Sequence, residues 1–167
     1  MSRAHLPANV TIRHDLRPGD IGYVTYLHGV LYAIEHGWDH TFDAYVAAPL
    51  AEFAKSHTDR ERIWIVEQDG LIAGSVAIVE VSREQAQLRW LLLHPELRGQ
   101  GIGRILVEEA VSFCRARGYS SVFLWTVSTL APAANLYKSA GFRLTEEKTH
   151  EAWGTLVTEE RYNLELR

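Results

Sequence analysis

The stretch from Leu91 to Arg104, Leu-Leu-Leu-His-Pro-Glu-Leu-Arg-Gly-Gln-Gly-Ile-Gly-Arg, limits the fold of this chain more than any other. It begins as an apolar strand. Pro95 ends that strand, because proline lacks an N–H and disfavours helix for the residue before it. An apolar helix is expected from about Ile102. The stretch therefore predicts a strand, a turn and a helix in direct succession.

The turn is rich in glycines, whose missing side chains let backbone N–H groups converge: Gly99, Gly101 and Gly103. The first N–H groups of a helix have no intrahelical partner, and the helix dipole adds to their attraction for anions. With Arg98 and Arg104 on either side, the expected guest is a phosphate. Glycines that serve tight packing alone are the other interpretation. The spacing fits neither a P-loop nor a dinucleotide fingerprint.

Length and composition favour one ordinary globular domain covering 1–167. The formal net charge of −4 argues against nucleic-acid binding. One cysteine, Cys114, cannot form an internal disulfide. No apolar run reaches membrane-spanning length, and the segment from Met1 to His5 lacks the apolar core of a signal peptide. We expect a cytoplasmic protein that binds neither membranes nor nucleic acid.

Hydrophobic periodicity predicts an α/β domain with a mixed central sheet of six to seven strands and about four helices, in the order β-α-α-β-β-β-α-β-α-β-β. Asp20 is expected to cap the first helix, Asp69-Gly70 to form a hairpin turn, and the unit from Gln85 to Val127 to be a parallel crossover. The expected strands are 10–14, 62–68, 71–81, 85–93, 122–127, 142–149 and 156–166, and the expected helices are 20–37, 40–55, 102–117 and 132–140.

Two motifs give a family resemblance. Arg98 to Gly103 matches the Arg/Gln-x-x-Gly-x-Gly/Ala signature of acetyl-coenzyme A-dependent N-acetyltransferases of the GNAT superfamily, and Leu136 to Phe142 resembles the Leu-Tyr-x-x-x-Gly-Phe that follows it. The resemblance covers nearly the whole chain and is weakest before Arg62. Gln87 to Trp90 and Leu124 to Thr126 further resemble the acetyltransferase half of MarR-type winged-helix fusions. No winged helix is expected here.

The resemblance implies acetyl-coenzyme A as co-substrate. It implies that backbone groups of the first strand bind the pantetheine arm, and that the N–H of Leu93 contacts the thioester carbonyl. Where the family often has an asparagine that bonds the pantetheine, this chain has Leu130. The cofactor-binding residues so implied are Leu91, Leu92, Leu93, Arg98, Gly99, Gln100, Gly101, Ile102, Gly103, Arg104, Ala133 and Tyr137.

The expected reaction is direct attack of an amine on the thioester, without a covalent enzyme intermediate. The family's tyrosine acid falls on Tyr137, which would protonate the leaving thiolate; packing is its other interpretation. Glu35 is the expected base, with Glu67 and Glu80 as alternatives on strands. Cys114 is expected to be a small core residue.

The acceptor site is expected at the turn from Glu35 to His40. A small-molecule or peptide amine would contact Glu35, Trp38, Asp39, Arg89 and Thr126. The other interpretation of that turn is a helix C-cap at Gly37 with solvated charges. Four tryptophans line an apolar wall or belong to the core: Trp38, Trp90, Trp125 and Trp153.

No metal site is expected, because His36 and His40 flank a glycine and lack a third ligand at a recognisable spacing. Dimerisation through the last strand pair is an open expectation. Two other functions remain: a non-catalytic acyl-coenzyme A sensor or interaction module, and a transferase that uses a longer acyl donor.

Overall fold

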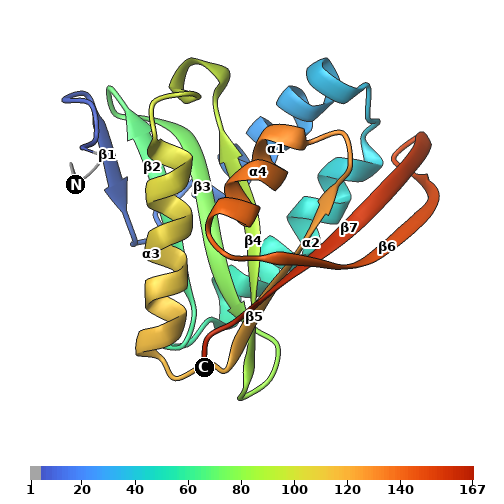
Figure 1. Cartoon of the computed structure of the whole chain (residues 1–167). Helices are drawn as coiled ribbons and strands as arrows, with labels where there is room; N and C mark the ends of the chain where they lie inside the picture. The colour runs from blue at the N-terminus through green and yellow to red at the C-terminus, as the bar shows by residue number, and fades with distance from the viewer. Residues whose placement is uncertain (1–4) are drawn as a thin grey trace.

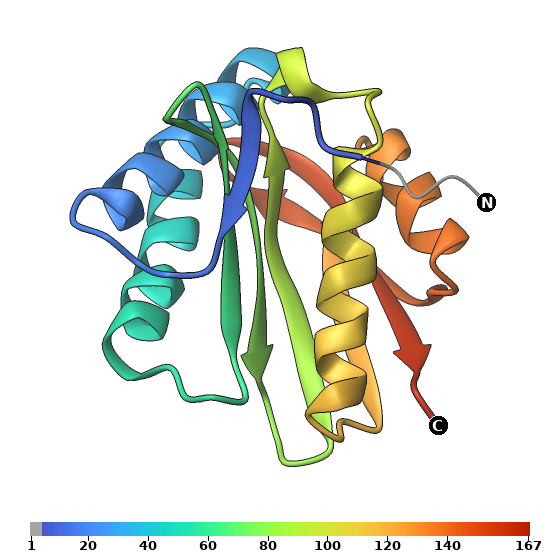
Figure 2. The same ribbon diagram turned by 90° about the vertical axis from the view of Figure 1, so that its left-hand side faces the viewer.

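The computed structural model describes residues 5–167, which form a seven-stranded sheet in the order β1-β2-β3-β4-β5-β7-β6. Helices cover both of its faces (Figure 1): α3 and α4 lie on one face, and α1 and α2 on the other. The second view shows these layers on opposite sides of the sheet (Figure 2). The predicted fold class and order of elements are confirmed.

The bounds follow the predicted ones within a few residues. The strands are β1 Val10–Arg13, β2 Arg62–Gln68, β3 Leu71–Glu80, β4 Gln85–Leu93, β5 Ser121–Val127, β6 Arg143–Ala152 and β7 Thr155–Glu165. The helices are α1 Asp20–His36, α2 Thr41–Ser56, α3 Ile102–Ala116 and α4 Ala131–Ser139, with the short 3-10 helix η1 Pro95–Leu97. None of the helices formed by residues 5–167 has the length and apolar character needed to cross a membrane.

The central strands bury both of their faces, since side chains alternate along a strand and each face is covered by helices. In β2, Trp64 and Val66 belong to the core beneath α3 and α4, whereas Ile63 and Ile65 belong to the core beneath α1 and α2. The sheet therefore separates the two cores. An opening in the sheet connects the layers of helices on its two faces.

Such an opening exists between β4 and β5. These strands pair in parallel, as predicted, but only from Gln85↔Ser121 to Gln87↔Phe123. Beyond Gln87 the carboxyl half of β4 pairs with β3 alone. A register shift between Ser75 and Ala77 accompanies a positive φ of 53° at Trp90, and this bulge bends β4 away from β5. The site lies where the strands part.

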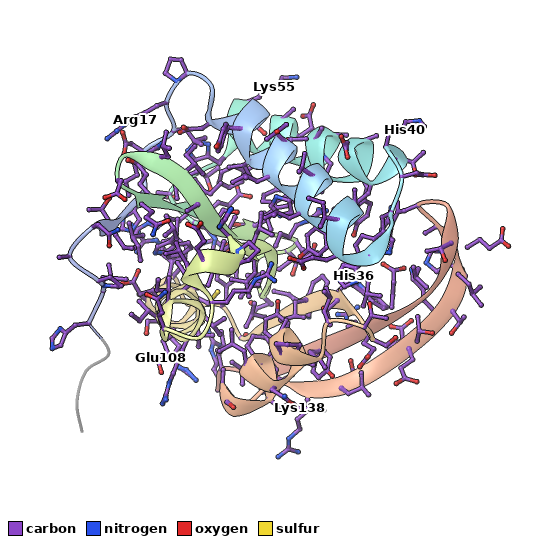
Figure 3. All side chains as sticks on the ribbon, turned by 90° about the horizontal axis from the view of Figure 1, so that it is seen from above. Arg17, His36, His40, Lys55, Glu108 and Lys138 are labelled. Carbon is purple, nitrogen blue, oxygen red and sulfur yellow. The ribbon has the colours of Figure 1, made fainter. Side chains whose placement is uncertain are left out.

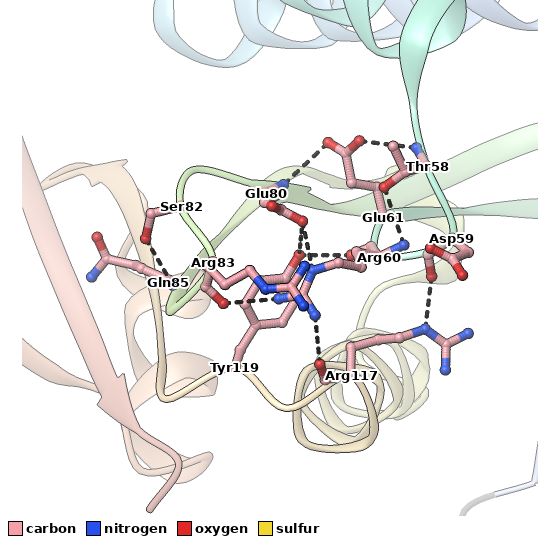
Figure 4. Close-up of polar contacts among 10 residues, drawn as sticks. All are labelled: Thr58, Asp59, Arg60, Glu61, Glu80, Ser82, Arg83, Gln85, Arg117 and Tyr119. Atoms are coloured by element: carbon pink, nitrogen blue, oxygen red, sulfur yellow. Dashed lines mark hydrogen bonds and ion pairs between the residues drawn. The ribbon is translucent and has the colours of Figure 1, made fainter.

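The opposite end of the same strand pair is held closed by polar side chains (Figure 4). Arg60 Nε donates to Glu80 Oε2 at 2.7 Å, and its guanidinium also reaches the carbonyl oxygens of Arg117 and Arg83, at 2.8 and 2.9 Å. Tyr119 donates its hydroxyl to the carbonyl of Arg60 at 2.8 Å. Glu80 is thus a structural carboxylate at the closed end.

Asp20 begins α1 as predicted but does not cap it, which corrects that expectation. Gly19, with φ 92°, occupies the N-cap position, and Asp20 is the first helical residue. The Asp20 carboxylate instead accepts hydrogen bonds from the Arg13 guanidinium and from the N–H of Arg17, all at 2.7 Å. Burial tends to raise the pKa of Asp20, but these donors outweigh it and hold the pKa below its usual range.

Candidate active site

The glycine turn has the geometry of an anion site. Gly99 and Gly101 have φ of 76° and 83°, a region that side chains disfavour. Gly101 is the N-cap of α3, and no side chain caps that helix. The side chain of Gln100 turns back to the Glu96 carbonyl at 2.8 Å and leaves the helix start clear. The first N–H groups of α3 therefore remain open to a ligand.

A cavity of about 520 Å³ lies against this turn. Its walls come from β4, the turn, the end of α1 and the start of α4. They are, in part, Leu91, Leu92, Leu93, Arg98, Gly99, Gly101, Gly103, Arg104, Thr129, Leu130, Pro132 and Ala133. We call this the outer cavity. Most of the predicted cofactor residues line it, whereas Gln100, Ile102 and Tyr137 do not.

Glu35 and Arg98 form an ion pair in the wall of the outer cavity, with 2.8 Å between Glu35 Oε1 and Arg98 Nη1. Arg98 Nε also donates to the carbonyl of Leu93 at 3.1 Å, which holds the guanidinium beside the end of β4. Glu35 therefore faces the predicted phosphate-binding cation. It does not line the second cavity described below.

The free edge of β4 supplies further donors. His94 donates its N–H to the carbonyl of Ala73 in β3 at 2.7 Å. Because backbone groups alternate along a strand, the N–H groups of Leu93 and Leu91 point the other way, toward β5. β5 does not pair with these residues. The edge therefore offers hydrogen bonds to a ligand lying in the gap.

A second cavity of about 120 Å³ continues from the first, and we call it the inner cavity. The two share four wall residues: Tyr32, Leu91, Leu130 and Ala133. The four predicted tryptophans all line the inner cavity, as do Arg89 and Thr126: Trp38, Trp90, Trp125 and Trp153. Asp39 lines neither cavity; its carboxylate accepts the N–H of Thr41, the first residue of α2, at 3.0 Å.

Tyr137 is buried and lines the inner cavity. Burial raises the pKa of its hydroxyl well above the usual value, and the neighbouring Tyr32 adds to the rise. Burial also raises the pKa of Tyr32, to about 12. Both phenols therefore keep their protons at neutral pH.

His28 projects from α1 into the wall of the inner cavity and is 3 % exposed. Its Nδ1 lies 2.8 Å from the carbonyl of Val24, which fixes the tautomer with the proton on Nδ1. Among residues 5–167, its buried Nε2 has no hydrogen-bond partner. Burial lowers the pKa of His28 from 6.5 to about 4, so the ring is neutral and this nitrogen is an acceptor.

Glu159 is the acidic residue of the inner cavity, and the sequence reasoning missed it. It lies on β7, opposite Val127, and is 8 % exposed. The signal was a glutamate two residues after Val157, at an inward-facing position of an alternating strand. The two glutamates predicted as alternatives to Glu35 lie elsewhere. Glu67 pairs with Arg13 and Glu80 pairs with Arg60, and neither lines a cavity.

Two other side chains that carry possible chemistry have structural positions. Cys114 is fully buried in the core beneath α3, where burial raises the pKa of its thiol to about 12, so its predicted packing role is confirmed. His36 ends α1 and His40 precedes α2 (Figure 3). Within the described part of the chain, no three metal-ligating side chains cluster.

Residues 29–142 match the model of the acetyltransferase (GNAT) family. The chain belongs to the GNAT family. The match contains the glycine turn, the free edge of β4 and Tyr137, whereas His28, Trp153 and Glu159 of the inner cavity lie outside it.

Curated relatives include other N-acetyltransferases. An uncharacterised N-acetyltransferase of Schizosaccharomyces pombe is 34 % identical over 150 residues, which cover 86 % of this chain and 89 % of the relative. Human N-acetyltransferase 8B is 30 % identical over 127 residues, covering 72 % of this chain and 56 % of that protein. This GNAT chain therefore spans most of the yeast relative but little more than half of the human one.

Solved structures share the fold. A Salmonella typhimurium acetyltransferase with its cofactor acetyl-CoA has a TM-score of 0.72 at 19 % identity, covering 95 % of both chains. A spermidine N-acetyltransferase from Vibrio cholerae, in complex with CoA and spermine, has a TM-score of 0.70 at 19 % identity, covering 95 % of this chain and 96 % of the other. At this identity the likeness establishes the fold.

Proposed function

We propose that this GNAT protein transfers the acetyl group of acetyl-coenzyme A to a primary amine by direct attack on the thioester. One observation carries the proposal: an uncapped helix N-terminus, a free strand edge and a buried tyrosine line two adjoining cavities in that order. The order matches the diphosphate, the pantetheine arm and the thioester of the co-substrate. Solved structures of the same fold that hold acetyl-CoA or CoA support this choice of co-substrate.

The residues of the outer cavity fit the diphosphate and the arm. The open N–H groups at the start of α3 and the Arg98 guanidinium suit the diphosphate. The backbone of Leu91 and Leu93 suits an extended arm that lies as an extra strand. Leu130 offers the arm only apolar contact, and Thr129 beside it has a hydroxyl.

The co-substrate supplies an activated acetyl carbon, and this chain's residues position the reaction. The N–H of Leu93 would stabilise the oxyanion that develops on the thioester carbonyl; losing such a donor typically costs about 2.7–4 kcal/mol. Tyr137 would give its proton to the departing thiolate. Alignment of amine and thioester in the inner cavity supplies much of the remaining rate acceleration.

We do not propose Glu35 as the base. A carboxylate paired with Arg98 in the outer cavity serves best as the counter-ion of that cation before the diphosphate binds. The alternative of a non-catalytic sensor is disfavoured by Tyr137, because a sensor has no use for a buried proton donor at the far end of the site. The alternative of a transferase that uses a longer acyl donor is tested in the same experiment.

The test measures release of free coenzyme A from acetyl- and succinyl-coenzyme A with a panel of small amines. In Tyr137→Phe we expect turnover to fall about 100-fold or more, as for loss of a general acid, with unchanged coenzyme A affinity by calorimetry. Tyr162→Phe is the matched control, because that hydroxyl donates to Glu160 away from both cavities. Wild-type turnover in Tyr137→Phe would remove the assignment of the acid.

A further inference from the structure

The inner cavity holds a carboxylate that is connected to the surface. Glu159 Oε2 lies 2.5 Å from His150 Nε2, and the His150 side chain is 43 % exposed whereas that of Glu159 is 10 % exposed. The two residues lie on neighbouring strands, β7 and β6, with Glu159 toward the cavity. A proton taken up by Glu159 inside the cavity therefore has a hydrogen-bonded route to water.

The other charged and titratable groups around Glu159 come from three elements. Lys148 Nζ, on β6, lies 3.6 Å from Glu159 Oε2. The same ammonium lies 4.8 Å from the centroid of the Trp125 ring. Tyr45 on α2 is close enough that Glu159 helps to raise its pKa, after burial as the main cause. Arg89 on β4 faces the same tyrosine and opposes that rise. Glu159 is thus the carboxylate in this group, in which Lys148 and Arg89 are cations and Tyr45 is a phenol.

Aromatic side chains form the remaining wall. Trp38 stacks on Tyr32, with ring centroids 5.1 Å apart, and contacts Trp153 at 4.6 Å. Aromatic faces attract cations, as a buried carboxylate does. The cavity therefore suits a small amine in its protonated form, which must lose a proton before its nitrogen can attack.

We infer that the acceptor enters as a protonated primary amine and that Glu159, relayed by His150, is the base that removes its proton. This rests on the proposed function and adds the substrate's charge and the route of the proton. The ammonium N–H bond breaks and its proton passes to the Glu159 carboxylate. Glu159 passes a proton to His150 Nε2, and the imidazolium releases one to water.

The rest of the reaction then balances. The freed nitrogen lone pair forms the N–C bond to the acetyl carbon, and the C–S bond breaks. The thiolate takes a proton from Tyr137, and the strongly acidic second proton of the attacking nitrogen passes to water. The tyrosinate regains its proton from water.

The experiment compares two amines of similar size in the full-length protein: ethylamine, which is protonated at neutral pH, and trifluoroethylamine, which is neutral. In Glu159→Gln we expect kcat/KM for ethylamine to fall about 100-fold, as for loss of a general base, and far less for trifluoroethylamine. Glu151→Gln, an exposed glutamate on β6, is the matched control. Equal losses for both amines would overturn the role of base.

The relay has its own test. His150→Asn should slow ethylamine turnover, and added imidazole buffer should restore it, whereas wild type and His57→Asn should not respond to imidazole. No response in His150→Asn overturns the relay. If wild type releases no coenzyme A with any amine, the proposed function itself fails. If wild type is active and Glu159→Gln is equally active, only the role of Glu159 as base fails.

Discussion

The two ends of the β4–β5 strand pair use their polar groups in opposite ways. At the closed end, Arg60 and Glu80 bind each other and Arg60 also binds main-chain carbonyls, while Tyr119 donates to the Arg60 carbonyl. At the open end, the His28 Nε2 and the N–H groups at the start of α3 have no partner in the described residues. Unpaired buried polar groups cost stability, and the open end that holds them is also the end where the two cavities lie.

The contacts at the closed end hold β4 and β5 together, so the two strands can stay unpaired at the open end. Gln85 Nε2 donates to Ser121 Oγ at 3.2 Å where both strands begin, and the pairing from Gln85 to Gln87 anchors them. The strands can separate at the other end without losing the sheet. Stability therefore depends on one end and the proposed function on the other, and substitutions at each end should separate these properties.

The largest effect is expected at the glycine turn. Gly101→Val puts a β-branched side chain at a φ of 83°, in front of the open N–H groups, and should weaken coenzyme A binding about 100-fold, which is about 2.7 kcal/mol. Calorimetry with coenzyme A measures it. Gly70→Val, with a similar φ of 80° in the hairpin turn, should share the strain but bind coenzyme A normally. Equal affinity in the two variants would contradict the anion site.

A smaller effect is expected from His28, as a dependence of stability on pH. Its folded pKa of about 4 lies below the ordinary 6.5, so the unfolded chain takes up a proton first as pH falls. This contribution to stability is present above pH 6.5 and is lost as pH falls toward 4. Between pH 7 and 5 it amounts to about 2 kcal/mol. Urea unfolding of wild type and His28→Phe at both pH values should show this difference, and parallel curves would contradict it.

The smallest effect is expected at the closed end. Glu80→Gln keeps the shape of the side chain but weakens its bonds to Arg60 and Tyr119, and should cost about 1 kcal/mol of unfolding free energy. Turnover and coenzyme A affinity should stay at wild-type values. Glu52→Gln, in an exposed ion pair with Lys55, is the control and should change neither property. A kinetic defect in Glu80→Gln would break the division between the two ends.

Much of the fold could be predicted because its signals are local. Pro95 and the glycines after it end one element and begin the next, and Asp69-Gly70 has positive φ at both residues, as its hairpin requires. The geometry of the glycine turn was predictable for the same reason, since it is that of a helix start. The ion pair of Glu35 was not predictable, because Arg98 comes from another part of the chain.

The sequence by itself determined the elements, their order and the glycine turn, because these depend on neighbouring residues and on periodicity. The tertiary structure decided where β4 and β5 separate, and hence which side chains line the inner cavity. The bulge at Trp90 opens the sheet, and β7 brings Glu159 to the gap from the far end of the chain. Burial and partners, which exist only in the folded chain, set the chemistry of His28, Tyr137 and Glu159.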